Sequence, residues 1–225
     1  MPLELDTFDC RVDLPDWRIH LASLAANTER DLRNVMDMAT KGAVAELQRS
    51  HPDGDLLADG TVSALHRSLT RLGFDPSRLP TCSEQLLSRI LNHRAIERGC
   101  LAWEFLNVLT VKSHAPWVAL DRQQLKPPLV FRIGAPDEIL VTPEGDFGCE
   151  GLPVLADTEA VKASPWTVNR PDDLVSAKDV VFLCFLPWEL FRKVQPKSHL
   201  GRVVWLTWAY RFVFERTCPG QTPPA

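Results

Sequence analysis

The chain has 225 residues, of which 45% are apolar, and a formal net charge of −4. This length and composition predict one packed domain and exclude a largely disordered chain. The acidic balance argues against bulk electrostatic capture of nucleic acid, although a local basic face would need only a few Lys and Arg side chains.

The six cysteines are widely spaced and contain no Cys-x-x-Cys pair. Zinc ligands usually come as close pairs, so we expect no metal, no cofactor and free thiols in a reducing compartment. The first residues lack both a basic start and an apolar signal region. No apolar run reaches the roughly 20 residues of a membrane helix. We therefore expect a cytoplasmic protein without a membrane segment.

The first third of the chain predicts one strand and two helices. Residues 17–26 combine an alternation of apolar and polar residues with a continuous apolar run, which indicates an early strand. Apolar residues recur at spacings of three and four over 29–49 and predict an amphipathic helix. A second helix follows at 62–72, and Gly73 is placed to end it as a C-terminal glycine.

Two more helices are expected before strand patterns begin to dominate the chain. Thr81 and Glu84 have the spacing of a capping box, in which each side chain satisfies a backbone amide of the other residue, and they open a helix over 81–91. Residues 98–112 read as a short helix, followed by a turn at Pro116.

Strand patterns dominate after residue 125. Residues 129–133 and 138–142 look like strands joined as a hairpin, because Gly-Ala-Pro-Asp lies between them. Further strands are expected at 152–157 and 179–186, and the second is apolar on both faces, which favours a central position. The apolar segment 200–216 is consistent with a helix or a strand, and the helix is the preferred interpretation.

Helices first and strands later, with one early strand, predict an α/β fold of the α+β sandwich type. Residues 1–60 would supply an N-terminal strand and helix that complete the fold. The main domain would span 61–216, with N-terminal helices and a C-terminal mixed sheet. Residues 217–225 contain three prolines and are expected to form a flexible tail.

One stretch carries the most specific pattern of the chain. Arg98, Asn107, Pro116 and Asp121 follow one another through the helix, the turn and an apolar segment. This spacing resembles the B3/4 domain of the bacterial phenylalanyl-tRNA synthetase beta subunit, and more closely its free-standing relatives. The flanks are similar too, through the Gly-Phe-Asp-Pro turn at 73–76, the Leu-Ala-Asp turn at 155–157 and the strand from Asp179.

The resemblance implies an editing module that hydrolyses the ester between a wrong amino acid and the 3′ end of tRNA. It also implies a non-covalent mechanism in which bound water attacks. The sequence departs from the family at Val118, where synthetase members carry a His that helps to bind the mischarged residue. The polar motif of the 166–173 loop is also altered, and Arg170 is either its remnant or an ordinary loop residue.

Candidate site residues follow from the resemblance and from side-chain chemistry. Asn107 would line the amino-acid pocket as donor and acceptor, or would bond its own helix end. Trp103 and Trp117 would flank that pocket and could stack on a base, or would simply belong to the core. Asp121 would contact the substrate, or would satisfy turn amides.

The remaining candidates are charged or titratable. Asp157 would orient the attacking water, or would cap a turn. The imidazole of His114 could move protons during ester hydrolysis. Arg98 could bind a phosphate or carboxylate, or remain solvated at a helix start. A basic cluster could meet tRNA phosphates or form a solvated face; it consists of Arg192, Lys193, Lys197, His199 and Arg202.

The sequence thus predicts a trans-editing deacylase of mischarged tRNA, with tRNA as partner. Two alternatives stay open. The chain is a tRNA- or RNA-binding module that has lost hydrolysis, or it is an amino-acid-binding regulatory protein that does not meet RNA. The pocket is expected between the 98–112 helix and the strands after residue 125.

Overall fold

The computed structural model describes residues 9–26, 32–92, 96, 98–142, 145–175, 177, 179–207 and 210–219. Six α-helices and two short 3-10 helices lie within these ranges: α1 (Arg33–Ser50), α2 (Gly60–Arg71), α3 (Cys82–Leu91), α4 (Leu101–Ser113), α5 (Trp188–Val194), α6 (Pro196–Thr207), η2 (Arg122–Gln124) and η3 (Pro171–Leu174). None of the described helices combines the length and apolarity needed to cross a membrane.

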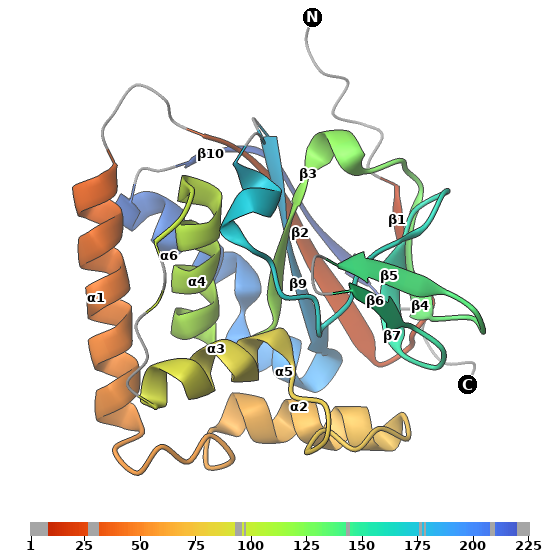
Figure 1. Cartoon of the computed structure of the whole chain (residues 1–225), viewed down its shortest axis with the longest axis horizontal. Coiled ribbons are helices and arrows are strands. Elements are labelled where there is room, and N and C mark those ends of the chain that lie inside the picture. The colour runs from red at the N-terminus through yellow and green to blue at the C-terminus, as the bar shows by residue number, and fades with distance from the viewer. Residues whose placement is uncertain are drawn as a thin grey trace, which may run out of the picture.

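The strands form two four-stranded sheets and a separate hairpin (Figure 1). The first sheet has the order β10-β2-β9-β3 and is antiparallel throughout. The second has the order β1-β4-β7-β8, and β5 pairs only with β6. The strand bounds are β1 (Cys10–Val12), β2 (Trp17–Ala26), β3 (Trp117–Asp121), β4 (Leu129–Ile133), β5 (Ile139–Thr142), β6 (Gly145–Gly148), β7 (Pro153–Ala156), β8 (Val161–Ala163), β9 (Asp179–Pro187) and β10 (Tyr210–Pro219).

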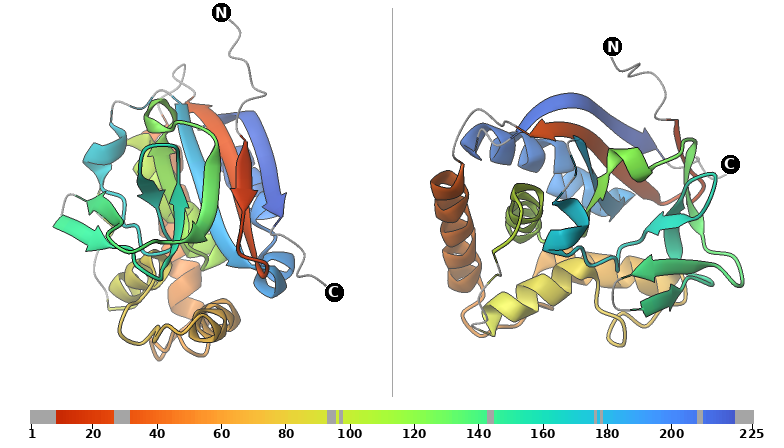
Figure 2. Two further views of the ribbon diagram at one scale, coloured as in Figure 1. Left: turned by 90° about the vertical axis from the view of Figure 1, so that its right-hand side faces the viewer. Right: turned by 45° about the horizontal axis from the view of Figure 1, so that its top comes forward.

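Helix α4 lies in the middle of the molecule, between α1 and the first sheet (Figure 2). Its sequence is apolar on nearly every side, and its residues from Ala102 to Val111 are buried except Glu104. A helix without a solvated face is stable only inside a core. The ring of Phe105 meets that of Phe182 on β9 edge to face, with centroids 5.2 Å apart. This helix therefore joins the helical layer to the sheet.

The α+β class predicted from the sequence is confirmed, and so are several local signals. Strand β9 is buried from Val180 onward and lies between β2 and β3, as its two apolar faces predicted. The capping box is present, since the Thr81 amide donates to Glu84 at 2.9 Å. Gly73 adopts a φ of 89° directly after α2, which a side chain would disfavour. The helix expected over 29–49 begins at Arg33, and residues 29–31 lie outside the described residues.

The hairpin expected between 129–133 and 138–142 is wrong. Strand β4 pairs with β1 and β7, whereas β5 pairs with β6. Every residue of β7 is buried, while Val141 of β5 is 73% exposed. Pairing β4 with β7 therefore buries more apolar surface than pairing it with β5, and burial decides between the two arrangements.

The segment 200–216 is only partly the helix that was expected. Helix α6 ends at Thr207, and β10 begins at Tyr210 and runs antiparallel along β2. A long strand such as β2 leaves unpaired backbone groups at a free edge, and β10 satisfies them. For the same reason residues 217–219 belong to β10 rather than to a tail, while 220–225 lie outside the described residues.

Candidate functional site

A small cavity lies beside α4, where α3, β3 and the segment after β8 meet it. Its volume is about 80 Å³. Asn107 and Trp117, two of the residues singled out from the sequence, line it together with Trp103. The other lining residues are Cys82, Gln85, Leu86, Arg89, Leu106, Thr110, Thr167, Val168 and Asn169. The cavity therefore has an aromatic wall and several neutral polar groups.

The Asn107 side chain is the most informative part of the lining. Only 6% of the residue is exposed, and within the described part of the chain its Nδ2 has no hydrogen-bond partner. A buried donor left without a partner costs about 1–3 kcal/mol, so native proteins keep few of them.

The walls around Asn107 are fixed by their own hydrogen bonds. The Trp117 indole donates to the Ser113 hydroxyl at 2.9 Å, and the Trp103 indole donates to the Asn169 carbonyl at 3.2 Å. The Asn169 carboxamide also accepts from the Ala119 amide at 2.9 Å and donates to the Ala119 carbonyl at 2.7 Å. It thus mimics a neighbouring strand at the edge of β3. These bonds preorganise the cavity before any ligand binds.

Two larger hollows adjoin the cavity through shared residues. One, of about 290 Å³, shares Gln85, Thr167 and Val168 with it and is also lined by Arg170. Another, of about 400 Å³, shares Thr167, Val168 and Asn169 and is also lined by Asp121. The cavity and the two hollows therefore lie around the same segment, residues 167–170.

Titratable groups are scarce in the cavity itself. Of its lining residues only Cys82 and Arg89 titrate. Burial raises the pKa of the Cys82 thiol to about 12, so that it stays protonated at neutral pH and is a poor nucleophile. Among the described residues, none that lines the cavity carries a carboxylate or an imidazole. Its chemistry is hydrogen bonding by neutral groups and contact with aromatic faces.

Three predicted contact residues lie at the margin of this region or away from it. Asp121 lines the larger hollow, and its carboxylate accepts from the Gln123 amide at the start of η2. Arg170 lines the other hollow, at the start of η3. Arg98 lies on the surface, where it pairs with Asp37 and Glu104. The helix start at Arg98 is thus held by ion pairs, and Arg98 does not line the cavity.

The structure places neither predicted catalytic residue in the cavity. Asp157 accepts from the Glu159, Ala160 and Lys126 amides at 2.8–3.0 Å, which is the turn-capping alternative. His114 follows the last turn of α4, where its Nδ1 lies 2.8 Å from Asp59. Sequence reasoning did not single out Thr110 or Asn169, since single polar residues in apolar or loop segments carry no recognisable pattern.

Removal of the Asp157 charge tests its assignment as a turn cap. Asp157→Asn is expected to lower the free energy of unfolding by about 1–3 kcal/mol at pH 7, because its three backbone donors lose a charged acceptor. Burial raises the pKa of Asp157, but the amides and Lys162 outweigh it and lower the pKa below 3.8. The native protein therefore loses this stabilisation as the pH falls below about 4, and the variant does not.

Urea unfolding at pH 7, 5 and 3.5 measures the effect of Asp157→Asn. The matched control is Asp146→Asn, because Asp146 is an exposed carboxylate on β6. A variant with unchanged stability but impaired ligand binding would contradict the turn-capping role.

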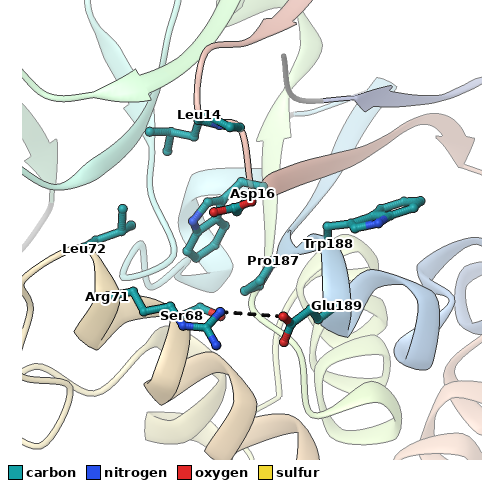
Figure 3. A pocket seen from close by; sticks show the side chains of 10 residues that line it. Leu14, Asp16, Ser68, Arg71, Leu72, Pro187, Trp188 and Glu189 are labelled. Carbon is teal, nitrogen blue, oxygen red and sulfur yellow. Dashed lines mark ion pairs between the residues drawn. The ribbon is translucent and has the colours of Figure 1, made fainter. Parts of the chain in front are cut away.

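A further pocket of about 240 Å³ lies on another part of the surface, between α2, the turn before β2 and the start of α5 (Figure 3). Arg71 and Glu189 form an ion pair of 3.7 Å across it, and both side chains are more than 60% exposed. Trp188 is half exposed, with the Arg18 guanidinium 4.7 Å from its ring centroid. The Arg71 and Glu189 charges of this pocket already pair with each other in contact with solvent, so these two residues offer a ligand less than Asn107 does in its cavity.

The predicted basic cluster lies on α5 and α6. Arg192, Lys193, Lys197 and Arg202 are exposed, and His199 is half-buried. None of them lines the Asn107 cavity or the two adjoining hollows. The cluster is therefore a separate surface feature.

Comparison with known proteins gives weak structural similarity and no match at the level of sequence families. No family model matches the chain, and no curated protein matches it either. The structure is similar to an N-terminal fragment of the phenylalanyl-tRNA synthetase beta subunit from Pyrococcus horikoshii, with 12% sequence identity and a TM-score of 0.43. The match covers 98% of this chain and 57% of that fragment. This chain thus spans little more than half the length of the fragment it matches.

Proposed function

We propose that this protein binds the aminoacylated 3′ end of tRNA, with the aminoacyl group in the Asn107 cavity. The observation that carries the proposal is Asn107, which lines a cavity with rigid walls and whose buried Nδ2 has no partner among the described residues. An ester or amide carbonyl would accept its hydrogen bond. The sequence resemblance to free-standing editing modules supplies the identity of the ester.

The size of the cavity limits the aminoacyl group. On the measure used for cavities, one water needs about 10–15 Å³. A volume of about 80 Å³ therefore corresponds to room for about five to eight waters and admits the carbonyl with a side chain of limited size. The fixed indoles of Trp103 and Trp117 leave little room for adjustment, so that size exclusion would select among amino acids.

The adjoining hollows would take the nucleotide that carries the ester. Their volumes of about 290 and 400 Å³ lie near the lower end of the range for small-ligand pockets, about 300–1,000 Å³. Arg170 at the margin could approach a phosphate. Asp121 on the other side could accept from a ribose hydroxyl or an amino group.

Deacylation is the second candidate function, and one feature favours it. A buried amide that donates to the ester carbonyl would also stabilise the negative charge that develops on that oxygen during hydrolysis. A general base is missing from the cavity lining, since neither Asp157 nor His114 lies there. The geometry therefore supports binding better than hydrolysis.

A paired assay separates these functions. The full chain is titrated with a panel of aminoacyl-tRNAs and with the same tRNAs uncharged, at two salt concentrations, and amino-acid release is followed in parallel. We expect tighter binding of tRNA that carries a small amino acid, with affinity falling as salt rises, and no release above background. Release that depends on Asn107 would select deacylation. Equal affinity for charged and uncharged tRNA, or binding of the free amino acid alone, would contradict the proposal.

A further inference from the structure

Three helix ends meet at one point away from the Asn107 cavity, below α1 and α4 (Figure 1). His51 directly follows α1, His114 directly follows α4, and Asp59 immediately precedes α2. One donor atom of each side chain lies within 4.8 Å of the other two. The carboxyl ends of α1 and α4 carry partial negative charge and the amino end of α2 carries partial positive charge, so that on balance the helix dipoles favour a cation here.

The hydrogen bonds of His51 fix which of its nitrogens is protonated. Its Nδ1 lies 2.9 Å from the Ser50 hydroxyl oxygen and 3.3 Å from the Leu47 carbonyl. The Ser50 hydroxyl donates to that same carbonyl at 2.9 Å, so its oxygen is left to accept. Both neighbours therefore require a proton on Nδ1. In the neutral ring, Nε2 then presents a lone pair, as in metal-bound histidines whose other nitrogen donates to a carbonyl.

That lone pair faces a carboxylate. The distance from His51 Nε2 to Asp59 Oδ2 is 3.7 Å, beyond a normal hydrogen bond. The other carboxylate oxygen, Oδ1, accepts from the Thr61 and Val62 amides at 2.8 and 3.0 Å, which fixes the orientation of the group. Two lone-pair donors that face each other at this distance leave room for a positive ion between them.

His114 completes the arrangement. Its backbone has a φ of 57°, a conformation that few residues other than glycine adopt, and its Nδ1 lies 2.8 Å from Asp59 Oδ2. Ligand atoms about 2.0–2.1 Å from a tetrahedral zinc ion are about 3.3 Å apart. The two distances to Oδ2, 2.8 and 3.7 Å, lie on either side of that value. Movements of about half an ångström would bring both to it.

We propose that His51, Asp59 and His114 bind a divalent transition-metal ion of the zinc type, with a fourth position open to water. Two imidazoles and one carboxylate suit zinc, whereas magnesium and calcium prefer all-oxygen sites. The three side chains are 9%, 15% and 18% exposed, so solvent can reach the ion. Sequence analysis did not identify this site, because its ligands lie at three different helix ends and form no pair that is close together in the chain.

The metal site does not depend on the proposed tRNA function. Asn107 precedes His114 on α4 by seven residues, which corresponds to about 10 Å along the helix. Around the site, Lys112 pairs with Glu46 at 2.7 Å, so that this lysine's charge is largely compensated. An ion here would tie together the ends of α1, α2 and α4 and stabilise the fold by binding only the folded state.

Metal titration of the full chain tests the proposal. After treatment with a chelator, the protein is titrated with Zn²⁺ by calorimetry and with Co²⁺ by visible absorption at pH 7.5. We expect one equivalent of Zn²⁺ to bind, a higher melting temperature, and Co²⁺ bands without the near-ultraviolet charge-transfer band of thiolate ligands. Mg²⁺ should give no heat. Absence of Zn²⁺ binding, or a thiolate band from the cysteines, would overturn the proposal.

Three variants should keep the fold and lose the metal. Asp59→Asn retains a good helix N-cap, His114→Asn places a residue that tolerates positive φ, and His51→Gln keeps a donor. Each is expected to weaken Zn²⁺ binding at least tenfold. The matched control is His66→Gln, because His66 contacts a carboxylate, Glu84, without a second histidine. Equal loss in the control, or unchanged affinity in the three variants, would place the ion elsewhere and contradict the proposal.

Discussion

Replacing Phe182 by alanine is expected to lower the free energy of unfolding by about 3–5 kcal/mol. Phe182 is fully buried in β9, between β2 and β3, and its ring packs against Phe105 of the central helix. The truncation removes apolar contacts from the point where the helical layer meets the sheet. It also leaves a cavity, because a paired central strand cannot move to fill the space.

Equilibrium unfolding in urea measures the effect of Phe182→Ala. The control is Val141→Ala on β5, where the side chain is 73% exposed and the change should stay within about 0.5 kcal/mol. Similar losses in both variants would show that the junction between α4 and β9 does not have the central role described above.

Asn107→Leu is expected to weaken binding of aminoacyl-tRNA about 100-fold. The substitution removes the donor for the ester carbonyl, and the new side chain fills part of a cavity of about 80 Å³. Loss of one such hydrogen bond, with the partner left unsatisfied, costs about 1–3 kcal/mol, and the steric block adds to it.

The same substitution should not lower the free energy of unfolding. Unchanged or higher stability together with weaker binding would identify Asn107 as a binding residue rather than a structural one. Asn107 Nδ2 is buried without a partner among the described residues, so leucine removes an unsatisfied group and adds apolar contact. We expect an unfolding free energy that is unchanged or higher by up to about 1 kcal/mol. Urea unfolding and tRNA titration of one preparation give both quantities. The control, Asn92→Leu at the exposed end of α3, should leave binding unchanged.

A less stable Asn107→Leu variant would contradict the assignment. It would mean that the Asn107 carboxamide stabilises the folded protein rather than a bound ligand. Unchanged tRNA binding in a stable variant would place the aminoacyl group elsewhere, and the pocket beside Arg71 and Glu189 would then be the next one to test.

Two of the residues that the family resemblance singled out lie together in the structure. Asn107 and Trp117 line the same cavity. Asp157 and His114 do not line it. The sequence could not exclude them, because a single Asp at a strand end or a His after a helix looks the same whether it caps a turn or faces a ligand. Their surroundings become visible only when distant segments are brought together, such as Lys126 beside Asp157 and Asp59 beside His114.

The sequence by itself determined the local elements of this protein. The capping box at Thr81, the glycine after α2 and the apolar run of β9 depend on neighbouring residues, and the chain encodes them within one turn or one strand. Only the tertiary structure decided which strands pair and which polar groups share a site. Both depend on contacts between residues far apart in the chain, where burial of apolar surface outweighs local preference.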